Sequence, residues 1–305
     1  MLWDHCKTNE SLSLSVLDHE DTLDFLASEK FFDAHEHETK WMEPDYAKVQ
    51  ACLGYAPIEV IKKTFEKMAQ FARNIVRLPF RTHLKSRFPA LNVHRRNEPV
   101  ATDTVWADEP AVDDGSMAAQ LFVGRNTYVT AVYGCKMDAE FAGILEDNIR
   151  QREAMDCLVS DGAKAEILAK VVDILRMYKC GNYMSEPEHQ HQNFAENRIR
   201  TLKDTSNRIM DRTGAPGYTW LLCLIYVAAL LNHLANANLG DFTPPLAAMY
   251  GVSPDISAYL NFYSNQPVLY AIDNKWPSES PEKSGRWMGV VHNGDDDLTY
   301  KNSNG

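Results

Sequence analysis

The chain has 305 residues, of which 45% are hydrophobic and 24% are charged, and its formal net charge is −11 at pH 7. This composition excludes global disorder and the fibrous classes, and the length allows one sizeable core with one or two small satellites. Six cysteines occur singly, without a Cys-x-x-Cys pair, which favours reduced thiols inside the cell, no disulfide and no zinc site. The start of the chain has no features of a secretory or transit peptide.

The N-terminal part of the chain divides into two stretches of different character. Residues 1–46 are acidic and only weakly periodic, so we expect a poorly ordered arm there. Residues 47–97 follow as a helical segment and a basic linker. Apolar residues recur at helical spacing from Val60 to Phe71, and Pro57 suits the start of a helix. This spacing predicts one helix, preceded by a turn, within residues 47–75.

A basic segment lies between residues 62 and 96, where Glu66 is the single acid. Its cations are Lys62, Lys63, Lys67, Arg73, Arg77, Arg81, Lys85, Arg87, Arg95 and Arg96. The segment is either a solvated helix face or a surface that contacts phosphates. On the second interpretation, Arg73, Arg77, Arg81 and Lys85 bind nucleic acid in spite of the negative net charge of the whole chain.

From residue 98 the pattern changes to strands and then alternates, and we assign residues 98–239 to one domain. Val100–Trp106 predicts a strand, and residues 119–123 and 127–133 predict a hairpin around Gly124-Arg125-Asn126. A helix from residue 138, a buried strand at residues 157–160 and a helix over residues 163–178 are expected next. This order predicts an α/β fold of the RNase H-like type, a mixed sheet flanked by helices.

Two more helices and a different C-terminal region complete the expected organisation. Residues 193–211 predict a polar helix and residues 218–237 an apolar one, separated by Gly214-Ala215-Pro216-Gly217. The apolar run from Trp220 to Leu231 is shorter than the ~20 residues that a membrane span needs, so we expect a buried helix and no membrane partner. Prolines and short β-like runs predict a small β-rich segment over residues 240–305.

Three acidic residues are candidates for a metal site. Asp161 directly follows the predicted strand at residues 157–160, at the edge where α/β sheets place ligands. Glu196 lies in the first turn of the predicted polar helix, and Asp103 lies in the first predicted strand. Carboxylates from separate elements that converge in this way can hold two divalent metals for phosphoryl transfer.

Each of these residues also has a structural interpretation. Asp161 could cap the helix that follows it, and Glu196 could be an exposed acid paired with Arg200. Glu196, Arg200 and Lys203 share one helix face, with Arg198 on the same helix, and these cations either contact DNA near the metals or form a solvated surface.

The motifs around these acids resemble those of one family. Leu158-Val159-Ser160-Asp161-Gly162-Ala163 and His191-Gln192-Asn193-Phe194-Ala195-Glu196-Asn197-Arg198 are similar to the second-Asp and Glu motifs of copia-type LTR retrotransposon integrases. Thr243-Pro244, Gly251, Pro254-Asp255-Ile256-Ser257 and Phe262 resemble the segment after the core in that family, and Gly285-Arg286-Trp287-Met288-Gly289 resembles its later β segment. The resemblance covers residues 50–300 and is greatest to copia-like elements of diatoms and related algae.

This resemblance implies a metal-dependent polynucleotidyl transferase that processes 3′ ends of element DNA and joins them to target DNA. It implies Asp103, Asp161 and Glu196 as catalytic ligands of Mg²⁺ or Mn²⁺, with Asp108 as the alternative first ligand. It also implies a homo-oligomer in the active state and a nuclear location. Gly162, Phe194 and Asn197 depart from residues common in the family, so a catalytically inactive DNA-binding relic stays open, as does an RNase H-like nuclease.

Overall fold

The structure is a computed structural model that describes residues 45–68, 87–161, 169–184, 194–251, 253, 255–271, 282–290 and 300–304. The chain divides into two compact units, Met1–Asp45 and Tyr46–Gly305. The described helices and strands all belong to the second unit, and the account that follows concerns that unit alone.

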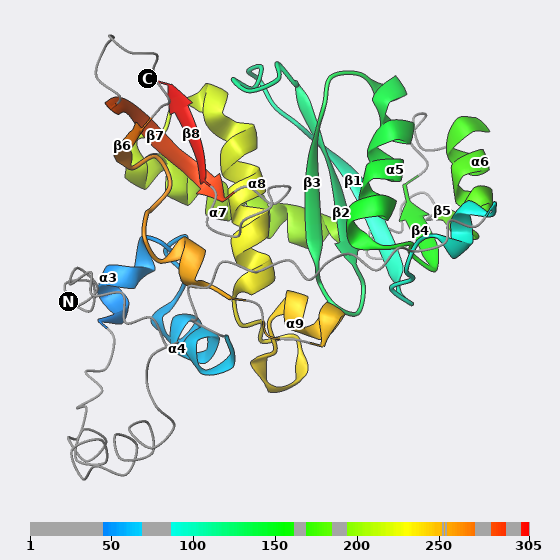
Figure 1. Cartoon of the computed structure of the whole chain (residues 1–305), viewed down its shortest axis with the longest axis horizontal. Helices are drawn as coiled ribbons and strands as arrows, with labels where there is room; N and C mark the ends of the chain where they lie inside the picture. Colours follow the sequence, from blue (N-terminus) through cyan, green and yellow to red (C-terminus); the bar gives the residue numbers. More distant parts are fainter. Residues whose placement is uncertain are drawn as a thin grey trace, which may run out of the picture. The chain divides into compact units, whose positions relative to one another are not determined.

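The centre of the unit is a five-stranded mixed sheet with the order β3-β2-β1-β4-β5 (Figure 1). Its strands are β1 (Pro99–Trp106), β2 (Ala118–Gly124), β3 (Thr130–Cys135), β4 (Cys157–Ser160) and β5 (Gly181–Met184). β1, β2 and β3 are antiparallel neighbours, whereas β4 runs parallel to β1 and β5 parallel to β4. Three antiparallel strands extended by two parallel ones in this order are the sheet of an RNase H-like fold, as the sequence predicted.

Helices cover both faces of this sheet (Figure 1). They are α5 (Phe141–Arg152) and α6 (Ala169–Met177) on one face, and α7 (Ala195–Thr213) and α8 (Trp220–His233) on the other. All seven residues of β2 are buried, because this strand lies inside the sheet and has helices on both sides. Each face therefore has an apolar core of its own.

The two cores differ in the segments that build them. The core under α5 and α6 includes Phe122, Leu145, Leu158 and Ile174. The core under α7 and α8 is larger, because the segments before and after the RNase H-like domain also contribute to it. Five short 3₁₀ turns connect described elements, at Pro89–Leu91, Asp138–Glu140, Gly217–Thr219, Gly240–Phe242 and Ser257–Tyr259.

The N-terminal segment contributes two short helices to the larger core. They are α3 (Tyr46–Gln50) and α4 (Ile58–Lys67), where the sequence predicted one helix within residues 47–75. Pro57 directly precedes the first turn of α4. Proline is tolerated there because the backbone N–H group that it lacks would have no hydrogen-bond partner within the helix. The buried Thr64 hydroxyl accepts a hydrogen bond of 2.9 Å from the Ala235 backbone N–H, which attaches α4 to the end of α8.

The C-terminal segment is a small three-stranded antiparallel sheet preceded by a helix. The helix is α9 (Pro245–Tyr250), and the strands are β6 (Pro267–Ala271), β7 (Glu282–Val290) and β8 (Tyr300–Asn304), in the order β6-β7-β8. Trp287 of β7 is 1% exposed and lies edge-on to the Tyr226 ring of α8, with 5.3 Å between the ring centroids. The predicted β-rich C-terminal segment is confirmed, and α9 is an addition to it.

α8 is nearly all apolar but ends at His233. Across the described segments, no helix combines the length and the apolar character that a bilayer crossing demands. Leu221, Val227 and Leu230 of α8 are instead buried in the larger core.

Candidate active site

Strand β1 directs Asp103 toward the face covered by α7. Successive side chains of a strand point to opposite faces, and Ala101 and Val105 of β1 both belong to apolar clusters that include residues of α7. Asp103 lies between them with the same parity, so its half-buried carboxyl group is on the α7 face. The backbone N–H of Thr104 donates a 2.7 Å hydrogen bond to Asp103 Oδ1.

The parallel register between β1 and β4 brings Asp161 beside Asp103. Ala101 pairs with Val159 in this register, and Asp103 and Asp161 each lie two residues further along their strands. If the register continues, the backbone positions of the two acids are neighbours on the same face, one strand spacing (about 4.8 Å) apart. Asp161 is exposed, directly after the end of β4.

A small apolar cluster places Glu196 over these two strands. Ala101, Val159 and Ala195 pack together with Val123, and Ala101 and Ala195 are fully buried. Because Ala195 is the first residue of α7, this cluster holds the start of the helix against the sheet, where α7 contacts β1 and β2. Glu196 is the next residue, so the three acids each follow a member of the same apolar cluster.

The pKa of Asp103 depends in part on the charges of the other two acids. Burial raises the pKa of the Asp103 carboxyl, and the charges of Asp161 and Glu196 raise it further. The Thr104 backbone hydrogen bond and the positive charge of Lys203 act in the opposite direction and only partly offset this rise. Asp103 is thus a carboxyl whose charged form is disfavoured by two neighbouring carboxylates, as expected where acids gather to hold a cation.

Asp108, the alternative first ligand, has a different position. It follows the end of β1 and is exposed, whereas Asp161 and Glu196 are among the largest influences on the pKa of Asp103. Asp103 is therefore the acid of this pair that shares a sheet face and an electrostatic environment with Asp161 and Glu196.

The three carboxylates fit a divalent metal by donor chemistry, because Mg²⁺ and Mn²⁺ take oxygen ligands. Within the described ranges, however, no group of three or more His, Cys, Asp or Glu side chains is close enough together to hold an ion. Their convergence to ligand distance stays a prediction, and Asp103, Asp161 and Glu196 are the residues that could hold the metal.

Two of the predicted nucleic-acid-binding cations lie on the exposed side of α7. Arg200 and Lys203 are both exposed, and Lys203 is close enough to Asp103 to lower its pKa. Lys203 is thus a cation at the edge of the acidic cluster. Arg73, Arg77, Arg81 and Lys85 lie outside the described residues.

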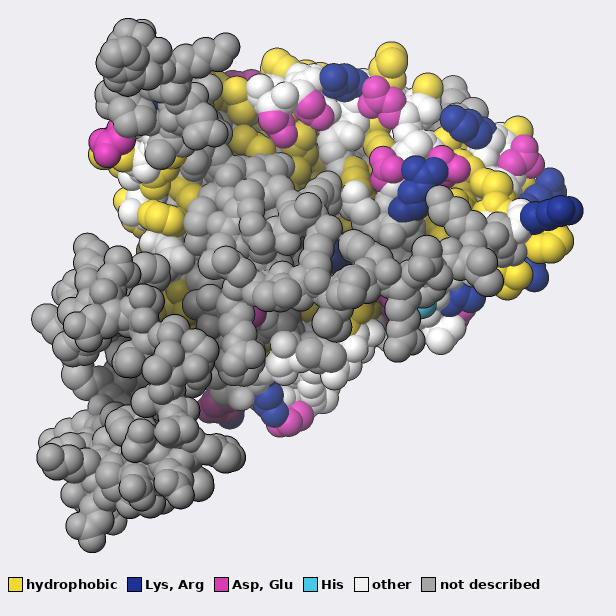
Figure 2. Space-filling view, viewed as in Figure 1, with side chains coloured by type: hydrophobic (Ala, Val, Ile, Leu, Met, Phe, Trp, Pro, Cys, Tyr) yellow, Lys and Arg dark blue, Asp and Glu magenta, His cyan; other side chains and the backbone are white. Residues whose placement is uncertain are grey.

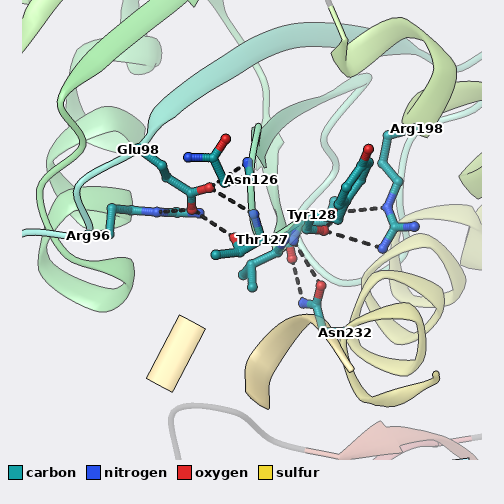
Figure 3. A network of polar contacts seen from close by, with 9 residues as sticks. Arg96, Glu98, Asn126, Thr127, Tyr128, Arg198 and Asn232 are labelled. Carbon is teal, nitrogen blue, oxygen red and sulfur yellow. Dashed lines mark hydrogen bonds and ion pairs between the residues drawn. The ribbon is translucent and has the colours of Figure 1, made fainter. Parts of the chain in front are cut away.

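Arg198 points into the protein. Its Nε donates a 2.9 Å hydrogen bond to the Thr130 hydroxyl, and its Nη2 donates to the carbonyl oxygens of Tyr128 and Leu231, each at 3.4 Å (Figure 3). Burial lowers the pKa of the guanidinium to about 10. The structure therefore gives Arg198 internal contacts that join α7 to α8 and to the start of β3.

Asn232 of α8 completes this junction. Its Oδ1 accepts a 2.8 Å hydrogen bond from the Thr130 N–H, and its Nδ2 donates a 2.7 Å bond to the Thr130 carbonyl oxygen (Figure 3). The side-chain amide thus occupies the place that a neighbouring strand would take at the outer edge of β3. This role of Asn232 could not be predicted, because in the sequence it is only a polar residue near the end of an apolar run.

A buried ion pair holds the turn between β2 and β3. Arg96 Nε donates a 2.8 Å hydrogen bond to Glu98 Oε1, and the two side chains are only 2% and 1% exposed. Glu98 also accepts bonds from the N–H groups of Asn126 and Thr127 and from the Thr127 hydroxyl (Figure 3). Burial alone would raise the pKa of Glu98, but Arg96 and these hydrogen bonds outweigh it and lower the pKa. We assign this pair to the structure of the hairpin.

The distribution of charge over the surface is mixed. On the face drawn in Figure 2, Lys and Arg side chains lie among Asp and Glu side chains, and the described part of this face has no extended patch of one sign. The cations near the acidic cluster are therefore a local feature in a chain with a net charge of −11.

No known protein-family profile matches the chain, and no curated protein matches it. Among solved structures, it is similar to the HTLV-2 integrase catalytic core domain in complex with magnesium, with 10% sequence identity and a TM-score of 0.41 over 50% of this chain and 97% of that one. The BIV integrase catalytic core domain gives 15% identity and a TM-score of 0.41 over 51% and 95% of the two chains. A simian T-cell lymphotropic virus intasome in complex with PP2A regulatory subunit B56 gamma gives 12% and 0.40 over 65% and 73%.

Proposed function

We propose that this chain is the catalytic core of a copia-type retrotransposon integrase, a metal-dependent enzyme that processes and joins DNA ends. The observation that carries the proposal is that Asp103, Asp161 and Glu196 each follow a member of one small apolar cluster on one face of an RNase H-like sheet. The motifs around Asp161 and Glu196 that resemble this family support the same assignment.

In this proposal the three carboxylates hold Mg²⁺ or Mn²⁺. The bound metals would activate a water molecule or a 3′-hydroxyl group and stabilise the leaving oxygen. Asp103 contributes a carboxylate whose negative charge its neighbours disfavour, so a cation at this position removes a repulsion that the fold otherwise maintains. Asp161 and Glu196 approach from the end of β4 and the first turn of α7.

DNA would approach along the exposed side of α7. Lys203 and Arg200 lie there beside the acidic cluster and would contact phosphates without reading the base sequence. Arg73, Arg77, Arg81 and Lys85 are proposed as a second phosphate-contacting group. An integrase with this activity would act on nuclear DNA, and we propose a homo-oligomer as the active form.

A strand-transfer assay with short blunt DNA duplexes tests the proposal. Purified wild type and Glu196→Gln would be compared in Mg²⁺ and in Mn²⁺, and both cleaved and joined products would be scored. Gln keeps the size and hydrogen-bonding capacity of Glu but lacks the charge that binds the metal, so we expect at least a 100-fold loss of joined product. Asp204→Asn, on the same helix, is the matched control and should keep wild-type activity.

The possible results separate three functions. Joined product that depends on Glu196 supports the integrase, whereas cleavage without joining identifies a nuclease of the same fold. DNA binding without any product in either metal, from wild type with a verified fold, identifies an inactive relic. Equal joining by wild type and Glu196→Gln would remove Glu196 from the mechanism.

A further inference from the structure

A pocket of about 320 Å³ lies where α4, α7 and α8 meet. Its walls are mostly apolar, with Val60, Leu230 and Leu234 among them. The polar residues that line it are Arg198, Thr201, Thr205, Arg208 and Asn236. Asp103, Asp161 and Glu196 are not among the residues that line it. The pocket is therefore separate from the acidic cluster, although α7 contributes to both.

Arg198 brings a half-buried positive charge to this pocket, and no carboxylate among the described residues pairs with it. Its hydrogen-bond acceptors are one hydroxyl and two carbonyl oxygens, and the two carbonyl contacts are long, at 3.4 Å. These contacts use Nε and Nη2, and Figure 3 shows the remaining nitrogen of the guanidinium pointing away from Tyr128. Buried charges are normally paired, because neutral acceptors replace the lost hydration only in part.

The other charged residue in the pocket is also positive. Arg208 lies on α7 and is exposed, whereas no Asp or Glu occurs among the described residues that line the cavity. The pocket of similar size beside β3 has the opposite character, since Asp113, Asp114 and Asp147 line it together with Arg152. The α4–α7–α8 pocket thus combines two cations with an apolar wall and lacks the acid that would neutralise them.

We propose that the α4–α7–α8 pocket binds a small anionic amphiphile, with a carboxylate or phosphate head group at Arg198 and an apolar body against Val60, Leu230 and Leu234. The anion would supply the charge partner that Arg198 does not have among the described residues. Burial of the apolar body against the aliphatic wall adds the hydrophobic contribution.

The volume limits the size of the ligand. A space of about 320 Å³ corresponds to about ten water molecules at ~30 Å³ each, so a ligand of about that many non-hydrogen atoms fits. Octanoate, with about ten non-hydrogen atoms, has this size, and octyl phosphate, with about thirteen, is slightly larger; together they present the two head groups. Octanamide has the same chain as octanoate and a polar but uncharged head, which makes it the matched comparison.

The test is isothermal titration calorimetry of the full chain with octanoate, octyl phosphate and octanamide. Because a charge-assisted hydrogen bond to a guanidinium is about twice as strong as a neutral one, we expect at least one of the two anions to bind at least ~10-fold more tightly than octanamide. Arg208 lies ten residues after Arg198 on α7, about 15 Å along the helix axis, so Arg208→Gln should weaken binding of that anion by less than about twofold, and Arg200→Gln, on the same helix but outside the pocket, should leave it unchanged.

A blocking variant locates the binding. Thr205→Phe places a ring in the pocket without removing a cation and should abolish saturable binding of the anion, with the fold verified by circular dichroism. Arg198→Gln is less suitable because Arg198 also joins α7 to β3. Equal affinity for the anions and octanamide, anion binding that survives Thr205→Phe, or no saturation by either anion would each overturn the proposal.

Discussion

Replacing Asp103 by Asn should stabilise the metal-free protein, because the fold holds this carboxylate beside two others. Asn keeps the oxygen that accepts the Thr104 N–H and removes the charge. Two unit charges about 4.8 Å apart, the strand spacing, repel by about 1–3.5 kcal/mol for effective dielectric constants between about 80 and 20. Since Asp161 is exposed, solvent screening favours the lower end. We therefore expect a gain of about 1 kcal/mol, or a Tm higher by about 2–4 °C.

Thermal unfolding in EDTA and in excess Mg²⁺ measures this effect and links it to metal binding. At a Mg²⁺ concentration ten times its Kd, wild type should gain about 1.4 kcal/mol, whereas Asp103→Asn should gain little because a ligand is missing. The variant is thus expected to be the more stable protein in EDTA and to lose that advantage in Mg²⁺. Asp108→Asn, an exposed acid beyond the end of β1, is the control and should change neither value. A lower Tm of Asp103→Asn in EDTA, together with an unchanged response to Mg²⁺, would refute the reasoning.

Two further predictions concern stability. Glu98→Gln should lower the free energy of unfolding by about 3 kcal/mol in urea titrations, because it leaves the buried Arg96 charge without its partner; a loss below about 1 kcal/mol would contradict this. Burial lowers the pKa of His233 to about 4 from 6.5, so the unfolded chain binds the proton first as the pH falls. Stability should be complete above pH ~6.5 and lower by about 2 kcal/mol at pH 5 relative to pH 7. His233→Phe should remove that part of the pH dependence, and an identical pH profile for the two proteins would exclude His233 as its source.

The position of the candidate site could be predicted because it depends on local patterns. The apolar run that ends at Ser160 predicted β4 with its observed bounds, and Asp161 follows it. The polar periodicity of α7 placed Glu196 in a first helical turn, as observed. Asp103 required more, because its relation to Asp161 depends on the register of two strands far apart in sequence. The sequence could indicate a strand but not that register.

Other elements could not be predicted because tertiary contacts determine them. β5 (Gly181–Met184) is an edge strand whose four residues are all exposed, so it has no apolar pattern. α9 begins at Pro245, and the prolines that argued against a helix instead lie at its start, where they are tolerated. The helix expected to begin at Pro57 is α4, and its predicted end lies outside the described residues, whereas α3 lies in the region where the sequence predicted a turn.

The inward position of Arg198 shows a different limit of sequence reasoning. On a polar helix, an arginine two residues after Glu196 looks like a surface cation, and helical spacing alone does not distinguish a side chain directed to solvent from one directed between helices. The distinction depends on how closely α8 packs against α7, which brings the Leu231 carbonyl oxygen and the Thr130 hydroxyl to the guanidinium. The role of Asn232 could not be predicted for the same reason, because its side-chain amide binds the edge of β3, which is far from it in sequence.

The acidic cluster is held by contacts that involve no acid. Carboxylates on adjacent strands and a helix start repel one another, so their own interactions would separate them. Ala101, Val159 and Ala195 oppose this by packing together, and the two alanines allow α7 to approach the sheet closely. Burial raises the pKa of the Asp103 carboxyl, and the charges of Asp161 and Glu196 raise it further. On the proposed function, we expect the same packing to lower the stability of the metal-free protein and to present these carboxylates to a divalent metal.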